Sequence, residues 1–421
     1  MQSNLKKTII VQILRILYNY TSPNYTVTQT NIVRYLNDID VPCSRKTVGR
    51  NIRYLIDVGV PIKRKNSRNG GYYYDIENDI TDNDYWCYII IGGRNTGKTY
   101  SCLKSCYVHD RPFVFVKRTL EDIDLLCDKK NEDLDFDVSP FKSINRDIGS
   151  NVRALKVKKG VGGFYKCNED NEPIGLPIGY VVSLSGVSKV KGFDLSDCDW
   201  IIFDEFIPQP WDRINRKEGE QLMDLYKTVS RDREHRGRPA LKLICLANAT
   251  KISNPVCNTL EITDKLVDMQ VGHTSYYKDP DRGIFVHQIR DNEAFMEEEK
   301  KSQIYKAMAN TDWGRMALNN DFAYDDFTAV KKSNLKGFIP LLGIQYKSKT
   351  YYIYDKEGLY YMTLAPAKVD RIYNLKIEND QKAFYIDWVI DLQEASINGQ
   401  LLFEQYTMYD LIMNFKQFFK L

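Results

Sequence analysis

The sequence predicts an α/β fold with more than one domain, and two observations carry this prediction. Short apolar segments that read as buried strands recur at residues 86–91, 112–118, 199–203 and 241–247, with helical patterns between them. A chain of 421 residues is also long enough for two or three domains, each with its own core. Apolar residues make up 43% of the chain and charged residues 27%, which is ordinary for a globular protein.

Segment 86–99 lies at the centre of this prediction. An apolar strand over residues 86–91 runs into a glycine-rich loop that matches the phosphate-binding pattern G-x-x-x-x-G-K-[ST] at every position. The loop consists of Gly92, Gly93, Arg94, Asn95, Thr96, Gly97, Lys98 and Thr99. Because a strand precedes the loop and a helical pattern follows at 100–108, a chance glycine-rich turn is disfavoured.

Each residue type in the loop has a physical role in holding a nucleotide. Gly92 and Gly97 let the backbone turn tightly and direct its N–H groups at phosphate oxygens. Lys98 brings a positive charge to the β- and γ-phosphates, and the Thr99 hydroxyl is a ligand for Mg²⁺. The helix after the loop turns the positive end of its dipole toward the phosphates. The loop therefore predicts a site for ATP and Mg²⁺.

A second motif is the apolar strand at 199–203, which is followed by Asp204 and Glu205. It fits the Walker B pattern, in which Asp204 holds the Mg²⁺ shell and Glu205 polarises the attacking water. An acidic pair after apolar residues is common on its own. Here it lies 106 residues after Lys98 with another strand between, which is typical of ATPases with an added strand between the Walker A and Walker B strands.

Two further residues are candidates for completing the site. The strand 241–247 ends at Asn248, a polar amide placed to sense the γ-phosphate, although a simple strand-end amide is the alternative. A helix predicted over 220–236 ends in cations that include Arg231. Arg231 is either an arginine finger for a neighbouring subunit's γ-phosphate or a cation that complements the helix dipole. Spacing alone does not decide between these two readings.

The N-terminal segment is strongly basic. Residues 1–74 hold twelve basic side chains against three acidic ones, whereas the whole chain carries a net charge of +3. Helices are predicted over residues 4–19 and 28–37, and a third helix begins after Ser44 as N-cap. Two short strands follow within 60–75, around a glycine turn. This order is that of a winged helix-turn-helix.

The basic residues of this segment fall on the third helix and on the predicted wing. They are Arg45, Lys46, Arg50, Arg53, Lys63, Arg64, Lys65 and Arg68. Such a balance indicates contact with a polyanion, and we expect these residues to bind DNA. The alternative is a winged helix that docks on protein, with its charges on a solvated face.

Cysteine and hydropathy patterns bear on the compartment. The nine cysteines form no C-x-x-C pair and no metal-ligand spacing, which is typical of a reduced cytosolic protein. No apolar run approaches the length of a membrane span, and the first residues lack the apolar core of a signal peptide. We therefore expect no membrane partner.

Four segments together, at 92–101, 202–207, 222–234 and 244–255, resemble the podovirus-type DNA encapsidation ATPases of small tailed phages. The resemblance implies a homo-oligomeric ring, usually a pentamer, in the host cytoplasm and docked on the procapsid portal while it translocates double-stranded DNA. It implies that Arg231 acts in trans, with Lys191 and Arg233 as further candidates for such a role. A small scaffold RNA is a further partner by the same resemblance.

The expected domains follow from the motifs and the resemblance. They are a winged helix-turn-helix DNA-binding domain at 1–78, a P-loop ATPase domain of the ASCE type at 79–275, a linker with a helical connection at 276–324, and a nuclease-like C-terminal domain at 325–421. By resemblance the last has an RNase H-like α+β fold. Its strands carry only scattered acids such as Asp355 and Asp387, so we expect no cleavage. Its aromatic tail, 403–419, is expected to be core helix.

The function predicted from the sequence is an ATP-driven DNA translocase that packages a phage genome. One alternative is a DNA-binding transcriptional regulator with a nucleotide-gated switch domain. Another is a non-catalytic assembly protein with a degenerate loop, which the intact Lys98, Thr99, Asp204 and Glu205 disfavour.

Overall fold

The computed structural model describes most of the chain, which folds as two units. The described residues are 9–14, 16–17, 21, 26–38, 41–57, 62–65, 70–74, 80, 84–93, 96–127, 138–187, 193–209, 212, 215–289, 303–308, 310–311, 322 and 325–419. The first unit comprises Met1–Lys251 and His273–Ala323, and the second comprises Ile252–Gly272 and Tyr324–Leu421. Among the described residues, no helix is long and apolar enough to cross a membrane.

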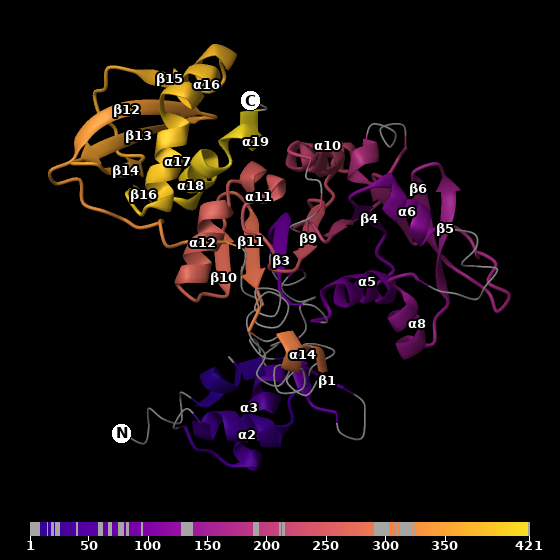
Figure 1. The fold of residues 1–421 in the computed structure, drawn as a ribbon. Helices are drawn as coiled ribbons and strands as arrows, with labels where there is room; N and C mark the ends of the chain where they lie inside the picture. Colours follow the sequence, from indigo (N-terminus) through magenta and orange to yellow (C-terminus); the bar gives the residue numbers. More distant parts are fainter. Residues whose placement is uncertain are drawn as a thin grey trace. The chain divides into compact units, whose positions relative to one another are not determined.

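The first unit is built on a nine-stranded sheet in the order β10-β11-β3-β9-β8-β4-β7-β6-β5 (Figure 1). Its strands are β3 (Cys87–Ile91), β4 (Phe113–Lys117), β5 (Val152–Lys158), β6 (Val161–Lys166), β7 (Gly179–Ser183), β8 (Trp200–Asp204), β9 (Lys242–Ala247), β10 (Tyr276–Asp279) and β11 (Ile284–Gln288). The strands from β11 to β7 are parallel, and β10, β6 and β5 add antiparallel edges.

The central strands read as continuous apolar runs because both faces of the sheet are covered. Every residue of β3 and β11 is buried. The described helices that follow β3 in this unit are α5 (Lys98–Val108), α6 (Leu120–Leu126), α8 (Lys142–Ile148), α10 (Glu218–Ser230) and α14 (Gln303–Met308), with short 3-10 helices at Leu184–Gly186 and Glu234–Arg236. Toward the β5 edge, the rings of Phe113, Phe141 and Phe164 pack together with centroids 5.1–6.4 Å apart.

The N-terminal segment has a small core of its own. Residues 9–14 and 16–17 are helical, and they are followed by α2 (Gln29–Asp38), α3 (Arg45–Asp57) and the antiparallel pair β1 (Ile62–Arg64) and β2 (Tyr72–Tyr74). The expected N-cap is confirmed, because the Ser44 hydroxyl accepts from the Thr47 N–H at 3.2 Å. The predicted order of three helices and a hairpin is therefore confirmed for the described residues.

The second unit contains a five-stranded sheet in the order β15-β12-β13-β14-β16. Its strands are β12 (Ile339–Tyr346), β13 (Lys349–Lys356), β14 (Leu359–Thr363), β15 (Ile372–Asn374) and β16 (Leu401–Phe403). Its helices are α11 (Pro255–Thr259), α12 (Thr263–Val271), α16 (Glu378–Phe384), a π-helical turn at Tyr385–Val389, α17 (Ile390–Ile397), α18 (Tyr406–Met413) and α19 (Phe415–Phe419). The aromatic tail is predicted to be core helix, and Phe403 and Phe415 are fully buried, but Phe403 ends strand β16 and the helices of the tail begin only at Tyr406.

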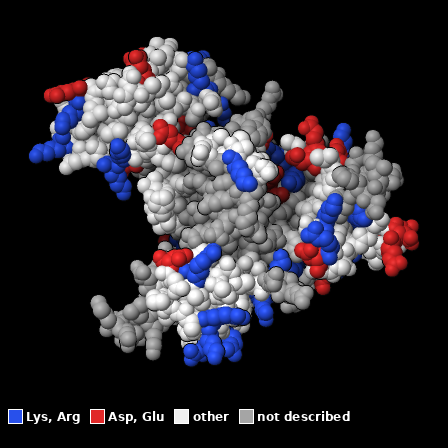
Figure 2. All heavy atoms as spheres, turned by 60° about the horizontal axis from the view of Figure 1, so that its bottom comes forward, with Lys and Arg blue, Asp and Glu red and all other residues white. Residues whose placement is uncertain are grey.

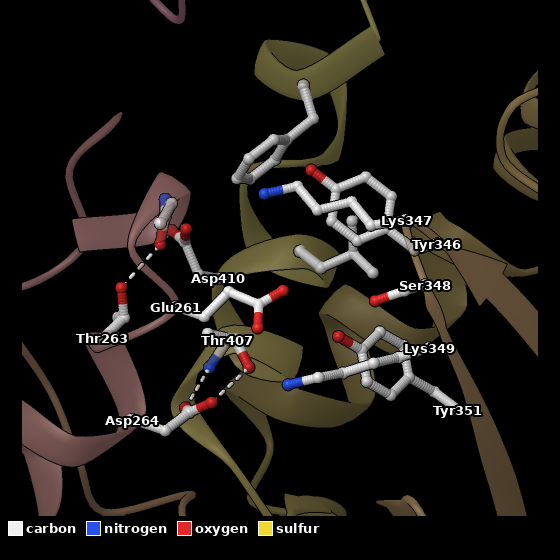
Figure 3. Close-up of a pocket in the computed structure, with 13 residues that line it drawn as sticks. Glu261, Thr263, Asp264, Tyr346, Lys347, Ser348, Lys349, Tyr351, Thr407 and Asp410 are labelled. Carbon is white, nitrogen blue, oxygen red and sulfur yellow. Dashed lines mark hydrogen bonds between the residues drawn. The ribbon is translucent and has the colours of Figure 1, made fainter. Parts of the chain in front are cut away.

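Helices α11 and α12 belong to the second unit although they lie between β9 and β10 in the chain. The Asp264 carboxylate accepts from the Thr407 N–H at 3.0 Å and from its hydroxyl at 2.8 Å, as Figure 3 shows. The Ser253 hydroxyl donates to Asp410 at 2.5 Å. A small cavity of about 60 Å³ lies beside these contacts, between α12, α18 and the turn from β12 to β13.

These placements correct two of the expected boundaries. The segment 276–324, predicted as a linker, contains β10 and β11, which complete the sheet of the first unit. The sequence conceals β11 because its apolar run is only three residues long and ends in His287 and Gln288, which are nonetheless buried. Residues 252–272, predicted within the ATPase domain, belong to the second unit.

Candidate active site

The glycine-rich loop leaves β3 at the carboxyl edge of the sheet. Gly97 has φ 83° and forms the N-cap of α5, so glycine is required where the chain turns into the helix. Lys98 and Thr99 open that helix, and Gly92 and Gly93 follow the strand directly. Arg94 and Asn95 lie outside the described residues. The local structure is therefore the predicted strand, loop and helix.

Lys98 is buried inside this loop. Its ammonium group donates to the carbonyl oxygens of Gly92 at 2.9 Å and Gly93 at 2.7 Å, and to the Thr96 hydroxyl at 3.1 Å. Burial lowers the pKa of Lys98 to about 8, although the carboxylates of Asp204 and Glu205 act in the opposite direction. The phosphates of a nucleotide would stabilise the charged form that burial now disfavours.

The order of strands brings the predicted site residues together. In the sheet β9 lies between β3 and β8, as expected for an ATPase with an added strand between the Walker A and Walker B strands, whereas β4, which separates the two motifs in the chain, lies on the other side of β8. The Thr99 hydroxyl donates to an Asp204 oxygen at 2.8 Å, across the end of β9. The Asn248 amide oxygen, just beyond β9, lies 3.3 Å from the Lys98 ammonium nitrogen. Parallel strands thus place these groups at one edge.

A cavity of about 330 Å³ lies at this edge of the sheet. It is lined by Thr96, Gly97, Lys98, Thr99, Tyr100, Asp204, Glu205, Leu246, Ala247 and Asn248. Among the described residues, no group of three His, Cys, Asp or Glu side chains could hold a metal ion. The Thr99 hydroxyl and the Asp204 carboxylate would suit Mg²⁺. This ion needs few protein ligands because water and phosphate oxygens usually complete its coordination.

Two cations at the end of β4, Lys117 and Arg118, belong to the site although no sequence motif includes them. The Lys117 ammonium group binds Asp204 at 3.0 Å and lies 3.9 Å from Glu205. Burial lowers the pKa of Lys117, but these two carboxylates outweigh burial and the pKa is raised. Arg118 donates to the carbonyl oxygens of Glu205 and Phe206. The available signal was a pair of cations at the carboxyl end of a strand beside Walker B.

The helix predicted over 220–236 ends earlier, at Ser230, and Arg231 follows it with φ 43° and ψ −121°. L residues rarely adopt this conformation, which is typical of constrained functional positions. The Arg231 guanidinium donates to the Phe193 carbonyl at 3.0 Å and pairs with Asp194 at 3.2 Å, with 40% of the side chain exposed. Arg231 is not one of the described residues that line the cavity beside Lys98.

Arg233 has a different environment from Arg231. All three of its guanidinium nitrogens donate within the chain, to the carbonyl oxygens of Pro239 and Cys198 and to the Asp199 carboxylate. Only 3% of this side chain is exposed. The guanidinium of Arg233 is thus fully engaged within its own chain, and a role for it in trans stays a prediction. Lys191, the other candidate for action in trans, lies outside the described residues.

All the candidate DNA-binding residues that the structure describes are exposed, on helix α3 and on the hairpin of the N-terminal segment. Helix α3 buries Val48, Ile52 and Leu55 in the segment's core. Its exposed side chains include Arg45, Lys46, Arg50 and Arg53, and Lys63, Arg64 and Lys65 are exposed at the hairpin. Figure 2 shows a group of Lys and Arg side chains over these elements. Arg68 lies outside the described residues.

Comparison with known families decides what kind of protein carries this site. The family model described as "Podovirus DNA encapsidation protein (Gp16)" matches residues 69–386. The chain belongs to this family. Membership, together with the site described above, makes it a phage DNA-packaging ATPase and disfavours the alternative of a nucleotide-gated transcriptional regulator. Residues 1–68 lie outside the matched part.

Individual relatives agree with the family. A protein of Bacillus phage B103 named "DNA packaging protein" is 26% identical over 341 residues, which cover 76% of this chain and 92% of the relative. A protein of the same name from Bacillus phage phi29 is 28% identical over 160 residues, 38% of this chain and 44% of the relative.

A solved structure of a similar fold is titled "The bacteriophage Phi-29 viral genome packaging motor assembly". It matches with a TM-score of 0.56 at 18% identity and covers 82% of this chain and 98% of that chain. A second, titled "The Phi-28 gp11 DNA packaging Motor", matches with a TM-score of 0.52 at 18% identity and covers 82% and 97%. At this identity the likeness shows the fold.

The lowered pKa of Lys98 predicts a pH dependence of stability in the nucleotide-free protein. The unfolded chain keeps the Lys98 proton up to about pH 10.5, whereas the folded protein loses it near pH 8. Between these values the unfolded state binds more protons, so this residue raises the free energy of unfolding as pH rises. Substitution Lys98→Met should remove the contribution.

Urea unfolding of the wild type and the Lys98→Met variant from pH 7 to pH 10 measures the difference between their free energies of unfolding. The titration of tyrosines and cysteines, which both proteins share, cancels in this difference. We expect the free energy of unfolding of the wild type, relative to that of the Lys98→Met variant, to increase from pH 7 to pH 10. Parallel curves for the two proteins would contradict the prediction.

Proposed function

We propose that the five predicted groups at the sheet edge hydrolyse ATP to drive double-stranded DNA into a procapsid. The observation that carries the proposal is their convergence on one cavity: Lys98, Thr99, Asp204, Glu205 and Asn248. The bound metal supplies positive charge to the phosphate oxygens, and Thr99 and Asp204 would hold it. Lys98 exchanges the loop carbonyl oxygens for phosphate oxygens when the nucleotide binds.

The remaining two groups act at the γ-phosphate. Glu205 follows β8 at the mouth of the cavity, and 64% of its side chain is exposed, so its carboxylate can accept a proton from the attacking water. Asn248 lies at the end of the neighbouring strand, where its amide can contact the γ-phosphate oxygens. The main chain of the loop and the N-terminus of α5 surround the other phosphates.

Substitution Glu205→Gln tests this assignment. The amide keeps the shape of the side chain but cannot take the proton, so we expect nucleotide affinity to remain while turnover falls by roughly 10²–10⁴-fold. Lys98→Ala should instead lose both binding and turnover. Steady-state hydrolysis and equilibrium binding of a fluorescent ATP analogue measure the two effects. Near-normal turnover of the Glu205→Gln protein would refute the role of Glu205.

The working assembly is a homo-oligomeric ring, with a pentamer as the expected size, that docks on the portal of a procapsid in the host cytoplasm. The relatives with solved structures are described as motors and as a motor assembly, which supports a ring. In such a ring Arg231 would reach the γ-phosphate of the neighbouring subunit. Its exposure and its absence from the cavity lining of its own subunit, among the described residues, support this role.

Mixing two inactive variants tests the role of Arg231 in trans. An arginine finger is worth roughly 10³–10⁵ in rate, so Arg231→Ala alone should be nearly inactive. Mixed rings of Arg231→Ala and Glu205→Gln subunits contain one kind of interface in which both groups are intact. We expect ATP hydrolysis to reappear in the mixture. A mixture as inactive as the separate variants would favour a helix-end role for Arg231.

The N-terminal segment, proposed here as a winged helix-turn-helix, selects viral DNA for the motor to which it is fused. Its exposed cations on α3 and the hairpin, and the position of residues 1–68 outside the family match, support this role. Arg45, Lys46, Arg50 and Arg53 would face the major groove, while Lys63, Arg64, Lys65 and Arg68 contact phosphates. Autoregulation of transcription and docking on protein are the rival uses.

Selection of preferred DNA sites from a random pool by the full-length protein separates these uses. The packaging role predicts a site at a viral DNA end, whereas autoregulation predicts a site in a promoter. With about four phosphates neutralised, the logarithm of affinity should fall with the logarithm of salt at a slope of about −3.6. Substitution of Arg45 and Arg50 by Ala should weaken preferred sites more than random DNA, by roughly 1–3 kcal/mol per base contact. A full-length protein whose duplex binding is unchanged by these substitutions would contradict DNA selection.

The second unit, proposed here as an RNase H-like domain without cleavage activity, would contact DNA, portal or a small scaffold RNA. Three antiparallel strands with a fourth strand parallel to the first support the comparison. Asp355 accepts from the Gly358 N–H in a turn, and Asp387 accepts from the Tyr373 hydroxyl. Each carboxylate thus has a local partner, and the absence of cleavage stays a prediction.

A further inference from the structure

The turn that carries Glu205 is held by an ion pair that the motifs do not include. Glu205 has φ 57°, a left-handed conformation that a residue with a side chain keeps only where its surroundings impose it. One guanidinium nitrogen of Arg118 donates to the carbonyl oxygens of Glu205 at 3.0 Å and Phe206 at 3.1 Å. Arg118 therefore holds the main chain of the turn from which the Glu205 side chain projects.

The other side of the same turn is fixed by the sheet. The Phe206 N–H donates to the Leu246 carbonyl of β9 at 3.0 Å, and the Phe206 ring is fully buried. The turn is thus held between β9 and the end of β4. Of these two supports, the β9 contact is a main-chain hydrogen bond that any residue could provide. The support from Arg118 depends on a side chain and can be changed by substitution.

Arg118 is held in turn by Glu218. Its Nε donates to a Glu218 oxygen at 2.9 Å, and Glu218 is only 1% exposed. Burial raises the pKa of Glu218, and the guanidinium of Arg118 opposes that shift. The second Glu218 oxygen has no hydrogen-bond partner among the described residues. A buried carboxylate is costly unless it is paired, so this residue is tied to Arg118.

We propose that Arg118 and Glu218 are positioning residues that hold Glu205 in the direction needed to activate water. This proposal rests on the role of Glu205 proposed above. Glu218 lies in the first turn of α10, and Arg231 follows the last residue of that helix. The pair therefore joins the turn of the hydrolysing carboxylate to the helix that carries the candidate finger. A change at either end of α10 reaches Glu205 through one guanidinium group.

The main test is Arg118→Lys, which keeps the charge but loses the planar fork that reaches three acceptors. We expect kcat to fall roughly ten- to hundredfold, as for a small misplacement of a catalytic group, with nucleotide affinity unchanged. Glu218→Gln keeps the shape and removes the charge, and it should lower kcat in the same sense but less. Arg282→Lys is the matched control, because Arg282 pairs with Asp279 at 3.9 Å in the turn after β10.

Single-turnover hydrolysis in two backgrounds separates positioning from general damage. If Arg118 acts through Glu205, Arg118→Lys lowers the rate of the wild type but not that of the Glu205→Gln protein. An equal loss in both backgrounds, a loss of nucleotide affinity that matches the loss of kcat, or normal kcat in both Arg118→Lys and Glu218→Gln would overturn the proposal. Normal turnover of Glu205→Gln by itself would instead refute the underlying role of Glu205.

Discussion

The hydrogen bond between the Thr99 hydroxyl and the Asp204 carboxylate joins the two halves of the site, and it depends on the strand order of the sheet. Thr99 opens the helix after β3, whereas Asp204 ends β8, and β9 lies between these strands. Although β3 and β8 are not neighbours, Thr99 and Asp204 meet because β3, β9 and β8 are parallel and end at the same edge of the sheet. The same edge receives Asn248 from β9 and Lys117 from β4, so one architectural constraint gathers residues from four strands.

Charge balance at this edge explains why Lys98 can be buried and Lys117 and Arg118 half-buried. Lys98 and Lys117 lie near Asp204 and Glu205, and Arg118 lies beside Glu218. Removing any one of these charges from water is costly unless an opposite charge or several acceptors compensate. Lys98 is the least compensated of the three, since its nearest acceptors are neutral oxygens and its pKa is lowered to about 8. The nucleotide-free site is therefore prepared for an anion at Lys98, whereas Lys117 already has its carboxylates.

How much could be predicted from sequence depends on how far apart the cooperating residues lie. The loop 92–99 could be recognised because contiguous residues carry its whole chemistry, and Asp204 and Glu205 because they end one apolar strand. Arg118 and Glu218 could not, because they are 100 residues apart and meet only when β4 and α10 pack. Strand β11 could not be predicted because His287 and Gln288, which are buried, interrupt its apolar pattern. Helices α11 and α12 were assigned to the wrong unit because chain order does not report long-range contacts.

The course of the chain after β9 gives the site a short covalent path to the second unit. Asn248 lies 3.3 Å from the Lys98 ammonium nitrogen, and the Thr250 hydroxyl donates to the Pro208 carbonyl in the segment that follows Glu205. The second unit begins at Ile252, where the main-chain N–H donates to Asp325. Asn248, which lines the cavity, and Ile252, where the second unit begins, are thus separated by a few peptide bonds. The end of β9, which Asn248 follows directly, therefore continues into α11 and α12 without a long linker, so few backbone dihedral angles lie between the cavity and the start of the second unit.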